Sequence, residues 1–101
     1  MDNLNLITCV VQRGRANEII TAALDAGAEG ATHFTGNGTG ARQKLGTVLS
    51  ELIIPEKDIV VIVIEDAIVD TVFEAIVVAG HLGKRGRGIA YVHKLDKAIG
   101  I

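Results

Sequence analysis

The chain has 101 residues, with ten Lys and Arg against twelve Asp and Glu and a formal net charge of −2. This length suits a single domain over residues 1–101, and a charge so close to balance argues against a nucleic-acid binder. Hydrophobic residues make up 49% of the chain, which excludes disorder on composition. No stretch is long enough to span a bilayer and the first residues lack the basic start of a signal peptide, so we expect a soluble cytoplasmic protein.

The first third of the chain predicts a strand, a helix and a second strand. Residues Leu4 to Gln12 are rich in β-branched and aliphatic side chains, and we expect Cys9, the single cysteine, to pack inside this strand. Gly27 follows the expected helix end, where a positive φ is often needed. The second strand is expected at residues 31–35. The helix is predicted by an apolar stripe at helical spacing, which consists of Ala16, Ile19, Ile20, Ala23 and Leu24.

A glycine-rich loop is expected from Gly36 to Gly46. Residues 47–54 favour the re-entry of a strand, and Pro55 with the three polar residues after it predicts a turn at 55–58. Because the segment 36–54 has many glycines and few apolar anchors, we expect it to be mobile when no ligand is bound.

The remainder predicts a strand, a helix and a last strand. Residues 59–64 are six consecutive aliphatic side chains, too few for a free-standing helix. Glu65 and Asp66 suit the positive end of a helix dipole, and Gly80 is expected to end that helix. A second glycine-rich loop at 82–88 precedes the last strand at 89–93. The helix stripe consists of Val69, Val72, Phe73, Ile76 and Val77.

This order predicts an α+β, ferredoxin-like βαββαβ fold, in which a four-stranded antiparallel sheet carries two helices on one face. The strand at 59–64 does not alternate between apolar and polar residues, so both faces of the sheet need cover, and two helices cover only one. We therefore expect a homo-oligomer whose sheets pack against each other. The alternative is that the loop and tail of the same chain cover the second face.

The motifs of known catalytic sites are absent, so we do not expect an enzyme. The three histidines, His33, His81 and His93, are isolated in the sequence, and no metal site is expected. Two glycine-rich loops hold half of the ten cations, which suits a phosphate-bearing small molecule, although glycines that only shape turns explain the same pattern. These cations are Arg42, Lys44, Lys84, Arg85 and Arg87.

Four segments resemble the P-II nitrogen-regulatory signalling proteins: GAEGAT at 27–32, GTGARQK at 38–44, the run at 54–77, and LGKRGRGIAYV at 82–92. The resemblance implies a homotrimer with an adenine nucleotide in each intersubunit cleft. It also implies control of a partner protein, such as a membrane transporter, through the loop at 36–54. The nucleotide-binding residues that it implies are Gly40, Arg42, Gln43, Lys44, Val63, Gly86, Arg87 and Gly88, with Gly30 and Thr32 from the neighbouring subunit.

The sequence also departs from the family pattern. Ile89 stands where the family has a phosphate-binding lysine, Gly100 stands at the first arginine position of the tail, and Arg87 replaces an acid. The missing lysine and the missing arginine remove positive charge from the place of the phosphates, and this favours ADP or AMP over ATP. The loop at 47–54 is short and has no tyrosine, so the family's uridylylation switch is not expected. The resemblance associates such proteins with carbon, bicarbonate or nitrogen metabolism.

Two alternatives remain open on the sequence. One is a trimeric scaffold or metal-tolerance protein of the similar divalent-cation-tolerance type, with the same fold and no nucleotide. The other is a degenerate nucleotide site whose oligomer serves only as a platform for other proteins.

Overall fold

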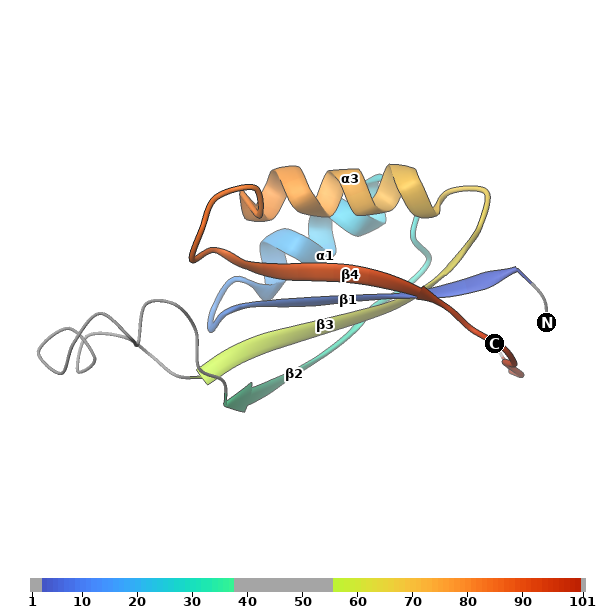
Figure 1. Cartoon of the computed structure of the whole chain (residues 1–101), viewed down its shortest axis with the longest axis horizontal. Helices are drawn as coiled ribbons and strands as arrows, with labels where there is room; N and C mark the ends of the chain where they lie inside the picture. The colour runs from blue at the N-terminus through green and yellow to red at the C-terminus, as the bar shows by residue number, and fades with distance from the viewer. Residues whose placement is uncertain (1–2, 38–55, 101) are drawn as a thin grey trace, which may run out of the picture.

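A computed structural model describes residues 3–37 and 56–100 (Figure 1). The expected strand at 47–54 and the expected mobility of 36–54 fall mainly on residues 38–55, which lie outside the described residues. No helix in the described ranges is long and apolar enough to cross a membrane. In chain order the elements are β1 (Leu4–Gln12), α1 (Ala16–Asp25), β2 (Thr32–Asn37), β3 (Glu56–Glu65), α3 (Val69–Gly80) and β4 (Gly88–Lys94).

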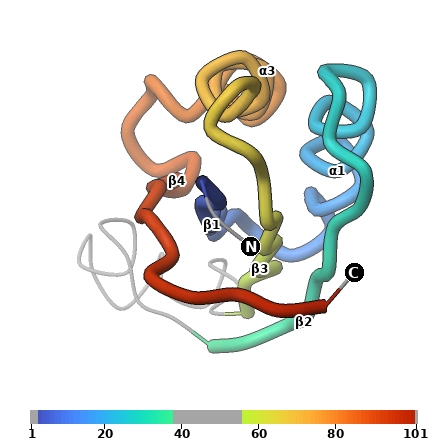
Figure 2. Tube along the Cα trace, turned by 90° about the vertical axis from the view of Figure 1, so that its right-hand side faces the viewer, coloured from blue at the N-terminus to red at the C-terminus, as the bar shows by residue number. Residues whose placement is uncertain are grey.

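The four strands form one antiparallel sheet in the order β2-β3-β1-β4. Both helices lie on the same side of this sheet, with α3 above β1 and β4 and α1 beside it (Figure 2). The predicted ferredoxin-like arrangement is confirmed. Since β1 and β3 are the two inner strands, their side chains dominate both faces of the sheet.

The core lies between the sheet and the helices. Ile7 and Cys9 of β1 are fully buried, and so are Val60 of β3, Ile19 of α1 and Ile76 of α3. Burial raises the pKa of the Cys9 thiol to about 11, which leaves the reactive thiolate scarce at neutral pH. Cys9 therefore packs as a small apolar residue, as the sequence predicts.

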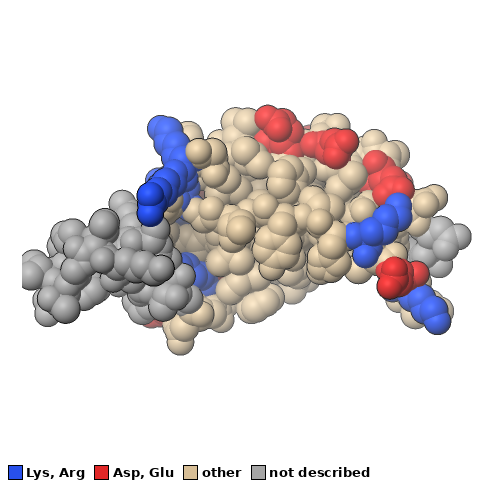
Figure 3. Space-filling model, viewed as in Figure 1, with Lys and Arg blue, Asp and Glu red and all other residues tan. Residues whose placement is uncertain are grey.

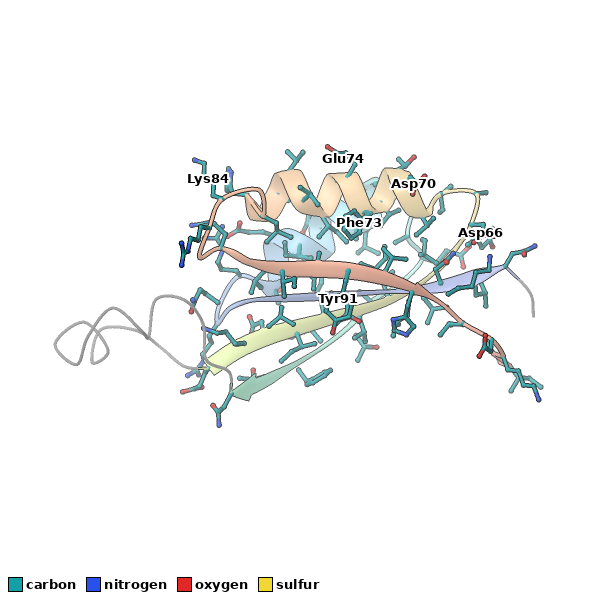
Figure 4. The ribbon with its side chains drawn as sticks, viewed as in Figure 1. Asp66, Asp70, Phe73, Glu74, Lys84 and Tyr91 are labelled. Atoms are coloured by element: carbon teal, nitrogen blue, oxygen red, sulfur yellow. The ribbon has the colours of Figure 1, made fainter. Side chains whose placement is uncertain are left out.

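The side of the sheet away from the helices, here called the open face, is also apolar. Residues opposite one another in an antiparallel ladder share a face, which places Leu6 and Val63 together on this side. Figure 4 shows Tyr91 on the side of β4 away from α3, whereas Phe73 points from α3 toward the sheet. Four large apolar side chains of the open face stay exposed with the described tail in place. They are 46–57% accessible and belong to Phe34, Val63, Ile89 and Tyr91.

Two of the predicted loop boundaries are wrong. β2 continues to Asn37, and β3 begins at Glu56, so the expected turn at 55–58 is strand over its described part. The physical reason is that Lys57 pairs with Gln12 of β1 while Glu56 pairs with Asn37 of β2. Ladder pairing on both sides outweighs the turn preference of these polar residues.

The predicted start of the second helix is also wrong. Glu65 ends β3, and Asp66 lies in the turn before α3, which begins only at Val69. Asp66 accepts hydrogen bonds from Lys94 Nζ and Asn5 Nδ2, each at 2.6 Å. The bond from Lys94, followed by that from Asn5, holds the pKa of Asp66 below its usual range. Asp66 thus joins three strands instead of stabilising a helix dipole.

The helix ends differ in chemistry. Gly27 has φ +119°, which confirms the expected left-handed residue after α1. After α3 that conformation falls on His81 (φ 53°), and Gly80 is the last helical residue. Gly80 is required for packing, because a Cβ there would lie 2.9 Å from Ile19 Cδ1.

Leu24, expected on the buried stripe of α1, is 44% exposed because it lies near the C-terminal end of the helix.

Gly88 at the start of β4 is expected to be irreplaceable. Its φ is +136°, and a Cβ would lie 2.3 Å from the carbonyl oxygen of Val10. We expect Gly88→Ala to lower the free energy of unfolding by more than about 2 kcal/mol, because the left-handed strain and the backbone clash add. Urea denaturation measures this loss. Gly83→Ala is the matched control, since nothing lies within 4 Å of its added Cβ; an equal loss in both variants would contradict the argument.

Candidate ligand site at the loop end of the sheet

Positive side chains gather at one end of the sheet, where β1 ends and both β3 and β4 begin (Figure 3). Only Lys94 and Lys97 of the described cations lie at the opposite end, beside the C-terminus. The turn before α1, the start of β3 and the loop before β4 supply the others. These six cations are Arg13, Arg15, Lys57, Lys84, Arg85 and Arg87. They make this end, here called the loop end, the part of the described surface best suited to an anion.

Two of the six cations are in surface ion pairs. Arg13 Nη1 lies 2.9 Å from Glu56 Oε2, and Arg15 Nη2 lies 3.1 Å from a glutamate three residues further along α1. Exposed pairs of this kind contribute little to stability. Within residues 3–37 and 56–100, the side chains of Lys84 and Arg85 have neither an ion pair nor a hydrogen bond. Lys84 projects from the loop after α3 (Figure 4), and these two side chains are open to a ligand.

Arg87 has a structural contact of its own. Its Nε donates to the carbonyl oxygen of Gly80 at 3.5 Å, at the C-terminal end of α3. The last turn of α3 has no basic residue, so the guanidinium of Arg87 supplies the positive charge that the helix dipole favours there. Arg87 is half-buried by this contact, and its two terminal nitrogens are the part left for an anion.

Asp58 accepts hydrogen bonds from several elements that meet at the loop end. Its Oδ2 accepts hydrogen bonds from the backbone N–H of Gly14 at 2.8 Å and of Ala16 at 3.2 Å, and its Oδ1 accepts one from Thr35 Oγ1 at 3.4 Å. The N-cap residue Arg15 makes no capping bond, so a carboxylate from β3 performs that task for α1. Asp58 is 7% exposed. It ties the stems on both sides of segment 38–55 to the turn before α1.

The nucleotide-binding residues expected from the sequence fall into separate places. Gly86, Arg87 and Gly88 lie at the loop end, where Gly88 pairs with Val11 of β1. Val63 pairs with Leu6, five residues back along β1, or about 17 Å away along the strand. Thr32, which begins β2, and Gly30 before it lie nearer to Val63 than to the loop end. The other expected residues, Gly40, Arg42, Gln43 and Lys44, lie outside the described residues.

The main chain around Val63 has an unpaired edge. β2 begins at Thr32, which pairs with Val61, so β3 runs four residues further than its neighbour on this side. Along residues 62–65 no strand of the described chain pairs with that edge of β3. Free backbone donors and acceptors of this kind can bind a planar heterocycle by its polar edge. That a nucleotide base binds beside Val63 stays a prediction.

Asp58 and Asp66 are the polar residues that sequence reasoning missed. Asp58 was assigned to a turn and Asp66 to a helix start, yet each carboxylate joins distant elements. A signal was present for Asp58: in the period-two alternation Asp58, Val60, Ile62 it occupies a core-facing position. A charged residue at such a position requires partners, because an unpaired buried charge is costly. Asp66 gives no comparable signal, since both partners lie on other strands.

The histidines are far apart in the structure. His33 lies on the edge strand β2, His81 caps α3, and His93 lies on the open face of β4. Among the described residues no group of three or more His, Cys, Asp or Glu side chains is placed to hold a metal ion. The alternative of a metal-binding protein therefore gains no support from this part of the chain.

The comparisons with known proteins agree with this architecture. The family model for nitrogen regulatory protein P-II matches residues 4–101. No curated protein matches the sequence. Among solved structures, the crystal structure of Arabidopsis thaliana PII bound to citrate is similar with a TM-score of 0.73, covering 100% of this chain and 82% of that chain. Its 19% identity shows a shared fold alone, and citrate is the ligand of that protein. Because the family model covers nearly the whole chain, the protein belongs to the nitrogen regulatory protein P-II family.

Proposed function

We propose that the protein is a homotrimeric, non-catalytic regulator in the cytoplasm. It binds an adenine nucleotide in the clefts between subunits, and the bound nucleotide controls its contact with a partner protein. Membership of a family of regulatory proteins supports the general role. The observation that carries the proposal is the separation of the described site residues: Val63 lies about 17 Å along the sheet from the loop that holds Gly86, Arg87 and Gly88.

The open face supports assembly of the subunits. Its apolar side chains lie on four adjacent strands, and large contiguous apolar patches are rare on the surfaces of monomers. A second and third copy would cover this face with the same kind of side chain. Closed rings of identical subunits are the usual outcome of such self-association.

The parts of the candidate site lie on opposite edges of one sheet, and this supports a binding site in a cleft between subunits. The loop before β4 and the stem of segment 38–55 lie at the same end of the sheet but on opposite edges, since β4 and β2 are its two outer strands. Three strand spacings separate these edges, or about 14 Å. A neighbouring copy brings its β2 edge beside the loop before β4 without any change in the fold.

The available cations favour a ligand with few phosphates. Ile89 offers no charge, and Arg87 is partly engaged by the carbonyl oxygen of Gly80. Among the described residues of the loop before β4, Lys84 and Arg85 remain to meet one or two phosphates. We therefore propose ADP or AMP as the ligand in preference to ATP.

Isothermal titration of the trimer with AMP, ADP and ATP tests this proposal. We expect ADP or AMP to bind more tightly than ATP. Arg85→Ala is expected to weaken ADP binding about fivefold, because two unit charges 4 Å apart and fully exposed to water attract each other by about 1 kcal/mol.

Lys97→Ala is the matched control, since it removes the same charge at the opposite end and should leave ADP binding unchanged. If none of the three nucleotides gives heat at millimolar concentration, nucleotide binding is wrong. The nucleotide-free scaffold of the same fold would then be the better description.

A further inference from the structure

The open face contains one ionisable side chain of unusual placement. Its central rows join Phe34, Ile59, Val10 and Ile89, then Thr32, Val61, Thr8 and Tyr91, then Val63, Leu6 and His93. Histidine is the only side chain type whose ordinary charge change falls between pH 5 and 8. His93 is the only histidine in these rows and on this face of the described sheet.

We propose that His93 makes the self-association of this protein depend on pH, so that protonation of its imidazole drives the subunits apart. This inference rests on the proposed packing of the open face against other copies of the chain. It concerns His93 on the outer strand β4, which is not among the expected nucleotide-binding residues.

The physical reason is that none of the described residues opposite His93 on the sheet carries a countercharge. Directly opposite His93 on β1 lies Leu6, and beyond it on β3 lies Val63; neither can stabilise an imidazolium. Each further copy packed on this face brings the same apolar rows, and the charged residues of its open face, Lys57 and Glu65, lie at the two ends of β3. A neutral imidazole fits such a surface at small cost, whereas a protonated one must give up its hydration without a partner.

The other charged groups near His93 do not compensate. Along β4 the nearest residue on the same face is Tyr91, whose side chain is a phenol and not a carboxylate. On β3, Glu65 lies one row further on and opposite Leu4, two strands away from His93. Lys94 bonds to Asp66 on the other side of the strand. Asp96 and Lys97 follow in the tail, with opposite charges.

The expected effect is large because it is repeated in every subunit. If each imidazolium weakens the packing about tenfold, three of them lower the association constant about a thousandfold. For a trimer, the protein concentration at half-assembly then rises about thirtyfold between pH 8 and pH 5.5. Ordinary carboxylates stay ionised over this range, so the change isolates the histidines.

Sedimentation velocity over a concentration series at pH 8 and pH 5.5 measures this shift, and circular dichroism verifies that the subunits stay folded. His93→Phe keeps a planar apolar side chain and should assemble equally at both pH values. The controls His33→Ala and His81→Ala remove histidines that lie off the open face and should retain the shift of the wild type.

Three results would overturn the inference. Equal assembly of the wild type at both pH values contradicts it and leaves the trimer intact. A shift that persists in His93→Phe assigns the effect to another group. A wild type that is monomeric at pH 8 removes the proposed packing itself, and the inference falls with it.

Discussion

The variant Val63→Asp is expected to be a folded monomer at concentrations where the wild type assembles. Val63 is 49% exposed in the single chain and lies on an inner strand, in the row formed with Leu6 and His93. A carboxylate there stays hydrated in the monomer but would be desolvated in the assembly. Burying an unpaired charge costs several kcal/mol, so the association constant should fall by at least about a thousandfold. Sedimentation velocity gives the distribution of species directly.

The matched control for this experiment is Val78→Asp. Val78 is 64% exposed on α3, which belongs to the helix layer and not to the open face of the sheet. The same chemical change there should therefore leave assembly unchanged. Circular dichroism should show equal folding of both variants, because neither side chain is part of the core. Assembly of Val63→Asp at the wild-type level would contradict the role of the open face. Dissociation of both variants would point to an interface on the helices.

Asp58→Ala is expected to lower the free energy of unfolding by about 2–3 kcal/mol, the largest loss from a single polar side chain in the described chain. The substitution leaves the backbone N–H groups of Gly14 and Ala16 without their acceptor in a buried place. It also removes the only capping group of α1, which alone costs about 1 kcal/mol. Urea denaturation of the purified protein measures the loss.

Two further variants separate the parts of this effect. Asp58→Asn keeps one oxygen acceptor and should cost less than the alanine variant. Thr35→Val removes only the long 3.4 Å bond to Oδ1 and should cost less than about 1 kcal/mol. If Asp58→Ala unfolds at the wild-type urea concentration, the carboxylate is not the link that this geometry indicates.

The fold was largely predictable because its signals are local and strong. The bounds of β1 match the predicted strand at both ends, and the aliphatic run 59–64 lies wholly within β3. Runs of β-branched residues favour a strand, and this preference can be read from the segment alone. The helix order and the apolar second face followed from the same periodicities.

The polar ends of the elements were not predictable in this way. Glu56 to Asp58 look like a turn by composition, and only pairing with β1 and β2 makes them a strand. His81 takes the left-handed conformation after α3, one residue beyond the glycine at which the sequence predicts the end of the helix. Contacts with distant strands decide the first of these positions.

The residues of the candidate site also separate into those that the sequence predicts and those that only the structure places. Glycine-rich loops with Lys84 and Arg85 could be found by reading the chain, since glycine and charge are local properties. Their separation from Val63 could not, because it depends on the register of three strands. That separation is also the argument for a second subunit in the proposed nucleotide site.

The amino-acid sequence by itself determined the order of the elements, the burial of Cys9 and the apolar character of both sheet faces. These properties arise from side-chain periodicity, which any segment carries alone. Only the tertiary structure decided that Asp58 caps α1, that Asp66 joins three strands, that Arg87 contacts the end of α3 and that His93 lies on the open face. Hydrogen bonds and strand register act between residues far apart in the chain, and their geometry exists only once the sheet has formed.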